Sequence, residues 1–214
     1  HYLLGFGHRR AAYISVHAER AWSRNRLLGV RDAFTGAAGD RGSVIEFRSA
    51  VPPPVLADIE RKEGAPLSEH MELLLRLRDI ETLRNRIEIL LRREVIRPLA
   101  LPLLQQCLAR RDITTWIAEN DDLALECLDF LKSRHVQVPG EISVMGFDDS
   151  MEGLVRGLTS YSFNAPGVVQ AMLTHILSPP ERARALTWSR TTEVDGFVNV
   201  RSTTAPRAAV LSGS

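Results

Sequence analysis

Short apolar runs that favour β-structure alternate along this chain with stretches of helical periodicity. The runs are five or six residues long and cover residues 11–16, 43–47, 114–118, 142–147, 158–163 and 197–201. Helical patterns cover residues 23–34, 99–110, 121–134 and 167–177. Strands that alternate with helices form parallel sheets, because each crossover helix returns the chain to the same edge. The pattern therefore predicts an α/β fold with a parallel sheet flanked by helices on both faces.

A long helical insertion, from about residue 50 to residue 96, interrupts this alternation. Within it, residues 68–96 carry leucine and isoleucine at spacings of three and four, which is typical of an amphipathic helix. The apolar face of this helix either packs on its own domain or forms a dimer contact. The double substitution Ile80→Glu plus Ile87→Glu would unfold the domain in the first case and give a folded monomer in the second.

The composition argues against a chain that binds nucleic acid or spans a membrane by itself. The sequence contains 27 Lys plus Arg and 26 Asp plus Glu, a net charge of +1, whereas nucleic-acid-binding surfaces carry a basic excess. No apolar run reaches the roughly 20 residues of a membrane span and no signal peptide is visible, so a cytoplasmic location is expected. Cys107 and Cys127 lie in helical patterns and are expected to be buried free thiols.

The sequence also lacks the motifs of common enzyme classes. The pair Gly5-x-Gly7 precedes a strand, whereas a dinucleotide site needs a third glycine and a position after a strand. There is no P-loop and no Gly-x-Ser-x-Gly elbow. The histidines are scattered, and neither cysteine has a partner at zinc-ligand spacing. We therefore expect no catalytic activity, no metal site and no cofactor.

Three motifs occur in order along the chain: Tyr2–Ile14 with Arg24–Gly29, then Ile117–Leu125, then Val138–Ser150. Each motif alone is weak. Together and in this order, they resemble the effector-binding sensor domains of LacI/GalR-type transcription regulators. The insertion at about 50–96 lies outside the resemblance.

The resemblance implies the type I periplasmic-binding-protein-like fold, with two lobes and a ligand cleft between them. It assigns residues 1–157, including the helical insertion, to the C-terminal lobe. Residues 158–178 would then cross toward the N-terminal lobe, residues 179–204 would return as a strand region, and residues 205–214 would form a flexible tail. Most of the N-terminal lobe and a head that binds operator DNA would lie outside this sequence, which starts within a helical pattern.

The same resemblance implies a ligand site at the carboxyl ends of the strands, where open α/β sheets bind ligands. The expected ligand-binding residues are Trp22, Arg26, Asn120, Asp148 and Phe163. Arginine donors, an asparagine amide and an aspartate acceptor suit the vicinal hydroxyls of a sugar or nucleoside, and a tryptophan can stack on a sugar face. Phe163 stands where the family usually has a polar residue, which favours a less hydroxylated ligand.

These residues also have structural interpretations. Asn120 and Asp121 lie between a strand and a helix, so either one could cap that helix. Asp148 could be a turn residue at a strand end, as we expect for Asp149. Arg26 could form a surface salt bridge, and an aromatic residue at the start of a helix often packs in a core or an interface.

The resemblance predicts the effector-sensing domain of a bacterial transcription regulator, in which a small molecule controls operator binding by a separate N-terminal head. Such regulators are typically homodimers, because a two-fold protein matches a palindromic operator. The main alternative is a periplasmic or extracellular solute-binding protein of the same fold, which a signal peptide in the full-length gene would support. A second alternative is an assembly protein without a ligand, which ligand-induced thermal stabilisation would exclude.

Overall fold

A computed structural model of the chain describes residues 1–36, 42–49, 51–52, 54–56, 58, 96–177 and 192–207. Within these residues, six strands form one sheet in the order β2-β1-β3-β4-β5-β6. Their bounds are β1 Arg10–Ser15, β2 Ser43–Arg48, β3 Thr115–Ala118, β4 Ser143–Phe147, β5 Thr159–Ser162 and β6 Phe197–Asn199. The first five strands are parallel, and β6 pairs antiparallel with β5. The predicted α/β fold is confirmed.

Helices cover both faces of the sheet. They are α1 Tyr2–Gly5, α2 Ala21–Gly36, α5 Asp121–Ser133, α6 Met151–Val155 and a helical stretch at residues 96–109, whereas α7 Ala165–Leu177 buries no residue and does not cover the sheet. The long helix predicted over residues 68–96 includes Ile80 and Ile87. Of this range, only Ile96 is among the described residues. Within the described ranges, no helix is long and apolar enough to cross a membrane.

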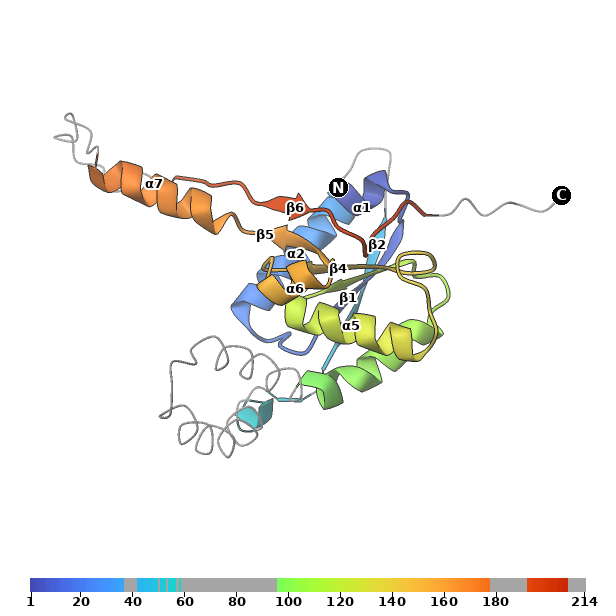
Figure 1. The fold of residues 1–214 in the computed structure, drawn as a ribbon. Coiled ribbons are helices and arrows are strands. Elements are labelled where there is room, and N and C mark those ends of the chain that lie inside the picture. The colour runs from blue at the N-terminus through green and yellow to red at the C-terminus, as the bar shows by residue number, and fades with distance from the viewer. Residues whose placement is uncertain are drawn as a thin grey trace, which may run out of the picture.

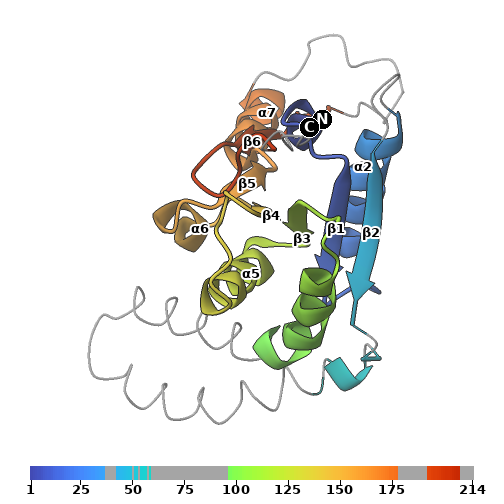
Figure 2. The same cartoon turned by 90° about the vertical axis from the view of Figure 1, so that its right-hand side faces the viewer.

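Alternation of side chains along the strands divides the core into two layers. Ala12 and Ile14 of β1 pack with α5 and the helix at 96–109, whereas Ala11 and Tyr13 pack with α1 and α2 on the other face. Figure 2 shows these helices on opposite sides of the sheet. The strands read as nearly continuous apolar runs because both of their faces are covered.

Both cysteines lie in the layer formed by α5 and the helix at 96–109. Cys107 and Cys127 are buried and free, as predicted. Burial raises the pKa of each thiol far above its usual value, which makes the reactive thiolate scarce. They therefore act as small apolar side chains of the core.

The structure has a helix between β4 and β5 that the helical patterns of the sequence do not include. Residues Met151–Val155 form the short helix α6. The hydroxyl of Ser150 accepts a hydrogen bond from the backbone N–H of Gly153 at 3.0 Å and so caps its first turn. The serine cap was the signal in the sequence, but five residues are too few to show helical periodicity.

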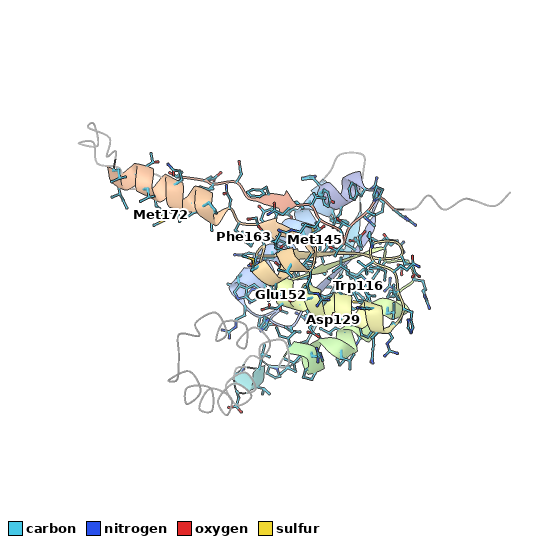
Figure 3. The ribbon with its side chains drawn as sticks, in the orientation of Figure 1. Trp116, Asp129, Met145, Glu152, Phe163 and Met172 are labelled. Carbon is cyan, nitrogen blue, oxygen red and sulfur yellow. The ribbon has the colours of Figure 1, made fainter. Side chains whose placement is uncertain are left out.

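Helix α7 extends away from the rest of the molecule, and the segment that leads into β6 runs back beside it (Figure 1). No residue of α7 is buried. Its apolar side chains are exposed, and they comprise Val168, Val169, Met172, Leu173, Ile176 and Leu177. The labelled Met172 lies on this helix, away from the sheet, in Figure 3.

After β6, residues 200–207 run back across the amino ends of the central strands. Thr203 accepts from the backbone N–H of Thr159 and donates to the carbonyl of Val144. Ala205 accepts from the ring of His8 at 3.0 Å, and the N–H of Arg207 donates to Phe6. Residues 208–214, most of the predicted flexible tail, lie outside the described residues. This C-terminal segment is therefore joined to the body by hydrogen bonds.

Candidate functional site

The guanidinium of Arg26 lies at the carboxyl ends of the central strands. It projects from α2 and donates to the backbone carbonyl of Glu119, which comes directly after β3, at 2.6 Å. It also donates to both carboxylate oxygens of Asp148, which comes directly after β4, at 2.5 Å and 3.3 Å. Arg26 is mostly buried, while the Asp148 side chain is 43% exposed. The ion pair therefore has one protected side and one side open to a ligand.

Aromatic rings surround the same guanidinium. Its central carbon lies 4.8 Å from the ring centroid of Trp22, 4.9 Å from that of Phe163 and 5.4 Å from that of Phe147. These distances fit cation–π contacts. Phe163 lies where the sheet passes into α7 (Figure 3). The structure thus brings four expected ligand residues together and adds Phe147, which sequence reasoning treated only as the end of a strand.

The backbone turns sharply after β4. Asp148 has φ 102° and Asp149 has φ 53°, backbone angles that residues other than glycine rarely adopt. The carboxylate of Asp149 accepts hydrogen bonds from Arg201 and from Asn199, and its N–H donates to Ser160. Asp149 therefore holds the turn, while the side chain of Asp148 points to Arg26.

Asn120, the fifth expected residue, caps α5. Its side-chain oxygen accepts from the backbone N–H of Leu123 at 2.9 Å. Asp121, the other candidate cap, is instead buried and accepts from the N–H of Ser150 and the hydroxyl of Ser160, both at 2.6 Å. Burial raises the pKa of Asp121. The capping oxygen of Asn120 is thus engaged in the fold.

A buried carboxylate lies beneath the site, and sequence reasoning missed it. Glu119 has no exposed surface, and its two oxygens accept from the N–H groups of Val16 and His17, from the His17 ring, and from the hydroxyls of Ser15 and Ser23. Burial by itself raises the pKa of Glu119, but the contact with His17 and the two serine hydroxyls lowers it below its usual value. The carboxylate is therefore ionised.

A hollow of about 730 Å³ opens beside these residues, lined by α1, α2 and four strands. Arg26, Trp22 and Phe163 line one part of it. The remaining walls are mostly apolar and include Phe34, Ile117, Met145, Tyr161 and Val198. A ligand with polar groups would therefore meet its partners near Arg26, and an apolar group would be accommodated further in. Across the described ranges, no three His, Cys, Asp or Glu side chains gather as a metal site.

The sequence profile of the periplasmic binding protein-like domain matches residues 1–185. The chain belongs to this family. An HTH-type transcriptional regulator of Mycobacterium tuberculosis is 28% identical over 176 residues, a match that covers 74% of this chain and 37% of that protein. The domain thus spans little more than a third of that curated relative. The predicted resemblance to the sensor domains of LacI/GalR regulators is confirmed.

Solved structures show the same fold at low sequence identity. A sugar-binding LacI-family regulator from Escherichia coli, complexed with phosphate, has a TM-score of 0.55 at 18% identity, over 96% of this chain and 58% of that one. A LacI-family regulator from Enterococcus faecalis with bound ribose has a TM-score of 0.51 at 14% identity, over 96% and 58% of the two chains. The periplasmic binding protein-like domain of this chain therefore shares its fold with these two LacI-family regulators.

Two further side chains, Glu126 and Val169, lie away from the Arg26 site. Glu126 is buried on α5 and its carboxylate accepts from Arg97 at 3.1 Å. Val169 is exposed on α7. Neither residue lines the hollow beside Arg26. Phe163, by contrast, lines the hollow.

Proposed function

We propose that this chain is the effector-sensing part of a LacI-family transcription regulator. It binds a small molecule of the sugar or nucleoside type at the carboxyl edge of its sheet and thereby controls operator binding by a separate N-terminal head. The observation that carries the proposal is the Arg26–Asp148 pair, which is buried on the side of the arginine, open on the side of the aspartate and enclosed by three aromatic rings.

The chemistry of this group suits a molecule with hydroxyls on one side and a flat apolar face on the other. Asp148 offers acceptor oxygens and Arg26 offers several donors in a fixed plane, which vicinal hydroxyls can meet in pairs. Trp22 and Phe163 offer ring faces for a sugar or a base. The side-chain nitrogen of Asn120 would add a donor. Ribose and phosphate in the two LacI-family structures support a ligand of this kind.

We further propose that the complete regulator is a cytoplasmic homodimer without enzymatic activity. The curated relative is described as a transcriptional regulator, and a two-fold assembly suits a palindromic operator. A solute-binding protein of the same fold remains the alternative, and an N-terminal signal peptide in the full-length gene would favour it. Sedimentation of the 214-residue chain at tens of micromolar tests the dimer, and a monomer would contradict it.

The ligand is tested by a thermal-shift screen of pentoses, hexoses, nucleosides and their phosphates, D-ribose among them, on the full-length gene product. A compound that raises the melting temperature is then titrated by calorimetry. The Asp148→Ala and Asn120→Ala variants should each weaken its binding by about 5- to 150-fold, because each loses a partner worth about 1–3 kcal/mol.

Asp129→Ala serves as the matched control. Asp129 forms an equally close pair with Arg156, at 2.6 Å, but that pair joins α5 to the end of α6. Its loss should leave the affinity unchanged. Binding of the compound with wild-type affinity by Asp148→Ala would show that the site assignment is wrong.

A further inference from the structure

We propose that Glu119 is the positioning residue of the effector site: its buried carboxylate fixes His17 and the first turn of α2, and thereby sets the places of Trp22 and Arg26. The name effector site rests on the proposed function. The geometry itself rests on the contacts of Glu119 alone.

The carboxylate joins the end of β1 and the start of α2, both of which lie about 100 residues before Glu119 in the sequence. Oε2 accepts from the hydroxyl of Ser15, at the end of β1, at 2.5 Å and from that of Ser23, in α2, at 2.7 Å. Oε1 accepts from the N–H groups of Val16 at 3.0 Å and His17 at 3.1 Å. A fully buried charge is stable only when several donors surround it. The loop between β1 and α2 therefore has one arrangement in which all of these donors reach Glu119.

His17 carries this constraint to the aromatic wall of the site. Its Nδ1 atom lies 2.7 Å from Oε1 of Glu119. An ionised carboxylate only accepts hydrogen bonds, so the proton of this contact belongs to Nδ1, and the ring orientation is fixed. The ring of His17 lies 5.6 Å from that of Trp22, with 45° between their planes. The position of Trp22 therefore depends on Glu119 through His17.

Glu119 also acts on Arg26 by two routes. Its backbone carbonyl accepts from the guanidinium at 2.6 Å. Its carboxylate holds Ser23, three residues before Arg26 on the same helix, so it limits rotation and sliding of α2 at this point. Asn120 follows Glu119 directly. This short segment after β3 therefore positions Trp22 and Arg26 and also supplies Asn120.

The proposal is tested without an effector, by fluorine NMR of the 214-residue chain labelled with 5-fluorotryptophan. The sequence has three tryptophans, and Trp22→Phe assigns the resonance of Trp22. In Glu119→Ala we expect this resonance to move by more than its linewidth or to broaden, while that of the core residue Trp116 stays in place. Glu126→Ala is the matched control, because it also removes a buried glutamate but on the far face of the sheet.

Two results would overturn the proposal. One is an unchanged Trp22 resonance in folded Glu119→Ala; the other is an equal displacement of that resonance in Glu126→Ala. If Glu119→Ala does not fold, His17→Ala replaces it, since it removes only the link to Trp22 and must displace the same resonance. Glu119→Gln keeps the shape and one accepting oxygen, so it should return Trp22 toward its wild-type position. None of these readouts uses a ligand, so failure of the proposed function would leave them unaffected.

Discussion

Helices α5 and α7 have the same length and both begin after an asparagine, yet they have opposite surroundings. Eight of the thirteen residues of α5 are buried, whereas α7 buries none although its sequence is the more apolar of the two. The difference lies in where each helix leads the chain: α5 returns it to the sheet as β4, while α7 takes it away from the sheet (Figure 1). The exposed apolar side chains of α7 therefore mark a surface that needs a partner. The crossover of residues 158–178 toward an N-terminal lobe remains the prediction that would supply one.

The largest effect should come from removing the same side chain from each helix. Leu131→Ala in α5 empties a fully buried position and should lower the free energy of unfolding by about 2–5 kcal/mol. Leu173→Ala in α7 removes an exposed side chain and should change it by less than about 0.5 kcal/mol in this chain. Urea unfolding followed by circular dichroism measures both. An equal loss in the two variants would show that α7 is packed in solution.

A smaller effect should distinguish the two asparagine caps. Asn120 accepts from Leu123, and Asn164 accepts from the N–H of Gly167 at 3.1 Å. Asn120→Ala should cost about 0.5–2 kcal/mol of global stability. Asn164 has φ 54°, a conformation that alanine adopts less readily than asparagine. Asn164→Ala should therefore reduce helical content, but it should not move the unfolding midpoint of the sheet. A shift of that midpoint in Asn164→Ala would contradict the independence of α7.

The smallest effect should be a response to acid that is confined to the body of the molecule. Burial lowers the pKa of His8 against the opposing hydrogen bond to Ala205. The unfolded chain takes up this proton near pH 6.5 and the folded chain resists it, so stability is complete above that pH and falls below it. Melting temperatures between pH 7.5 and 5.5 measure the slope.

His8→Gln is the control for the acid response. This variant should melt at a lower temperature at pH 7.5 but show a flatter dependence on pH. Helix α7, which buries no residue, should not contribute. A slope as steep in His8→Gln as in the wild type would assign the response to another group.

The sequence predicted the parts of the fold that depend on local pattern. The strand at residues 11–16 and the helix at 121–134 match β1 and α5 within one residue at each end, because both elements bury long apolar runs. The helix α6 was missed because its Ser150 cap is a single residue without a periodic segment behind it. The antiparallel direction of β6 depends on the path of the chain after α7, which no local pattern specifies.

The site was predicted in part, and the missing part has one cause. Arg26, Trp22, Asp148 and Phe163 were expected, and they lie together around one guanidinium. Glu119 was missed because a glutamate is normally exposed, and only the meeting of β1 with β3 brings the donors of Ser15 and His17 to it. The choice of Asn120 over Asp121 as the cap likewise resulted from the burial of Asp121 against β5.

The pairing of β1 with β3 has a consequence for the speed of folding. Ala11 pairs with Thr115, so the centre of the sheet forms only after a loop of about 100 residues has closed, and such distant contacts slow folding. Each doubling of loop length costs only about 0.6 kcal/mol of closure entropy. The length of the connection between β2 and β3 therefore changes this closure cost only slightly, and a loop of half the length should speed folding by at most about threefold. On a ribosome, β1 must wait for β3 to emerge before its second edge is covered.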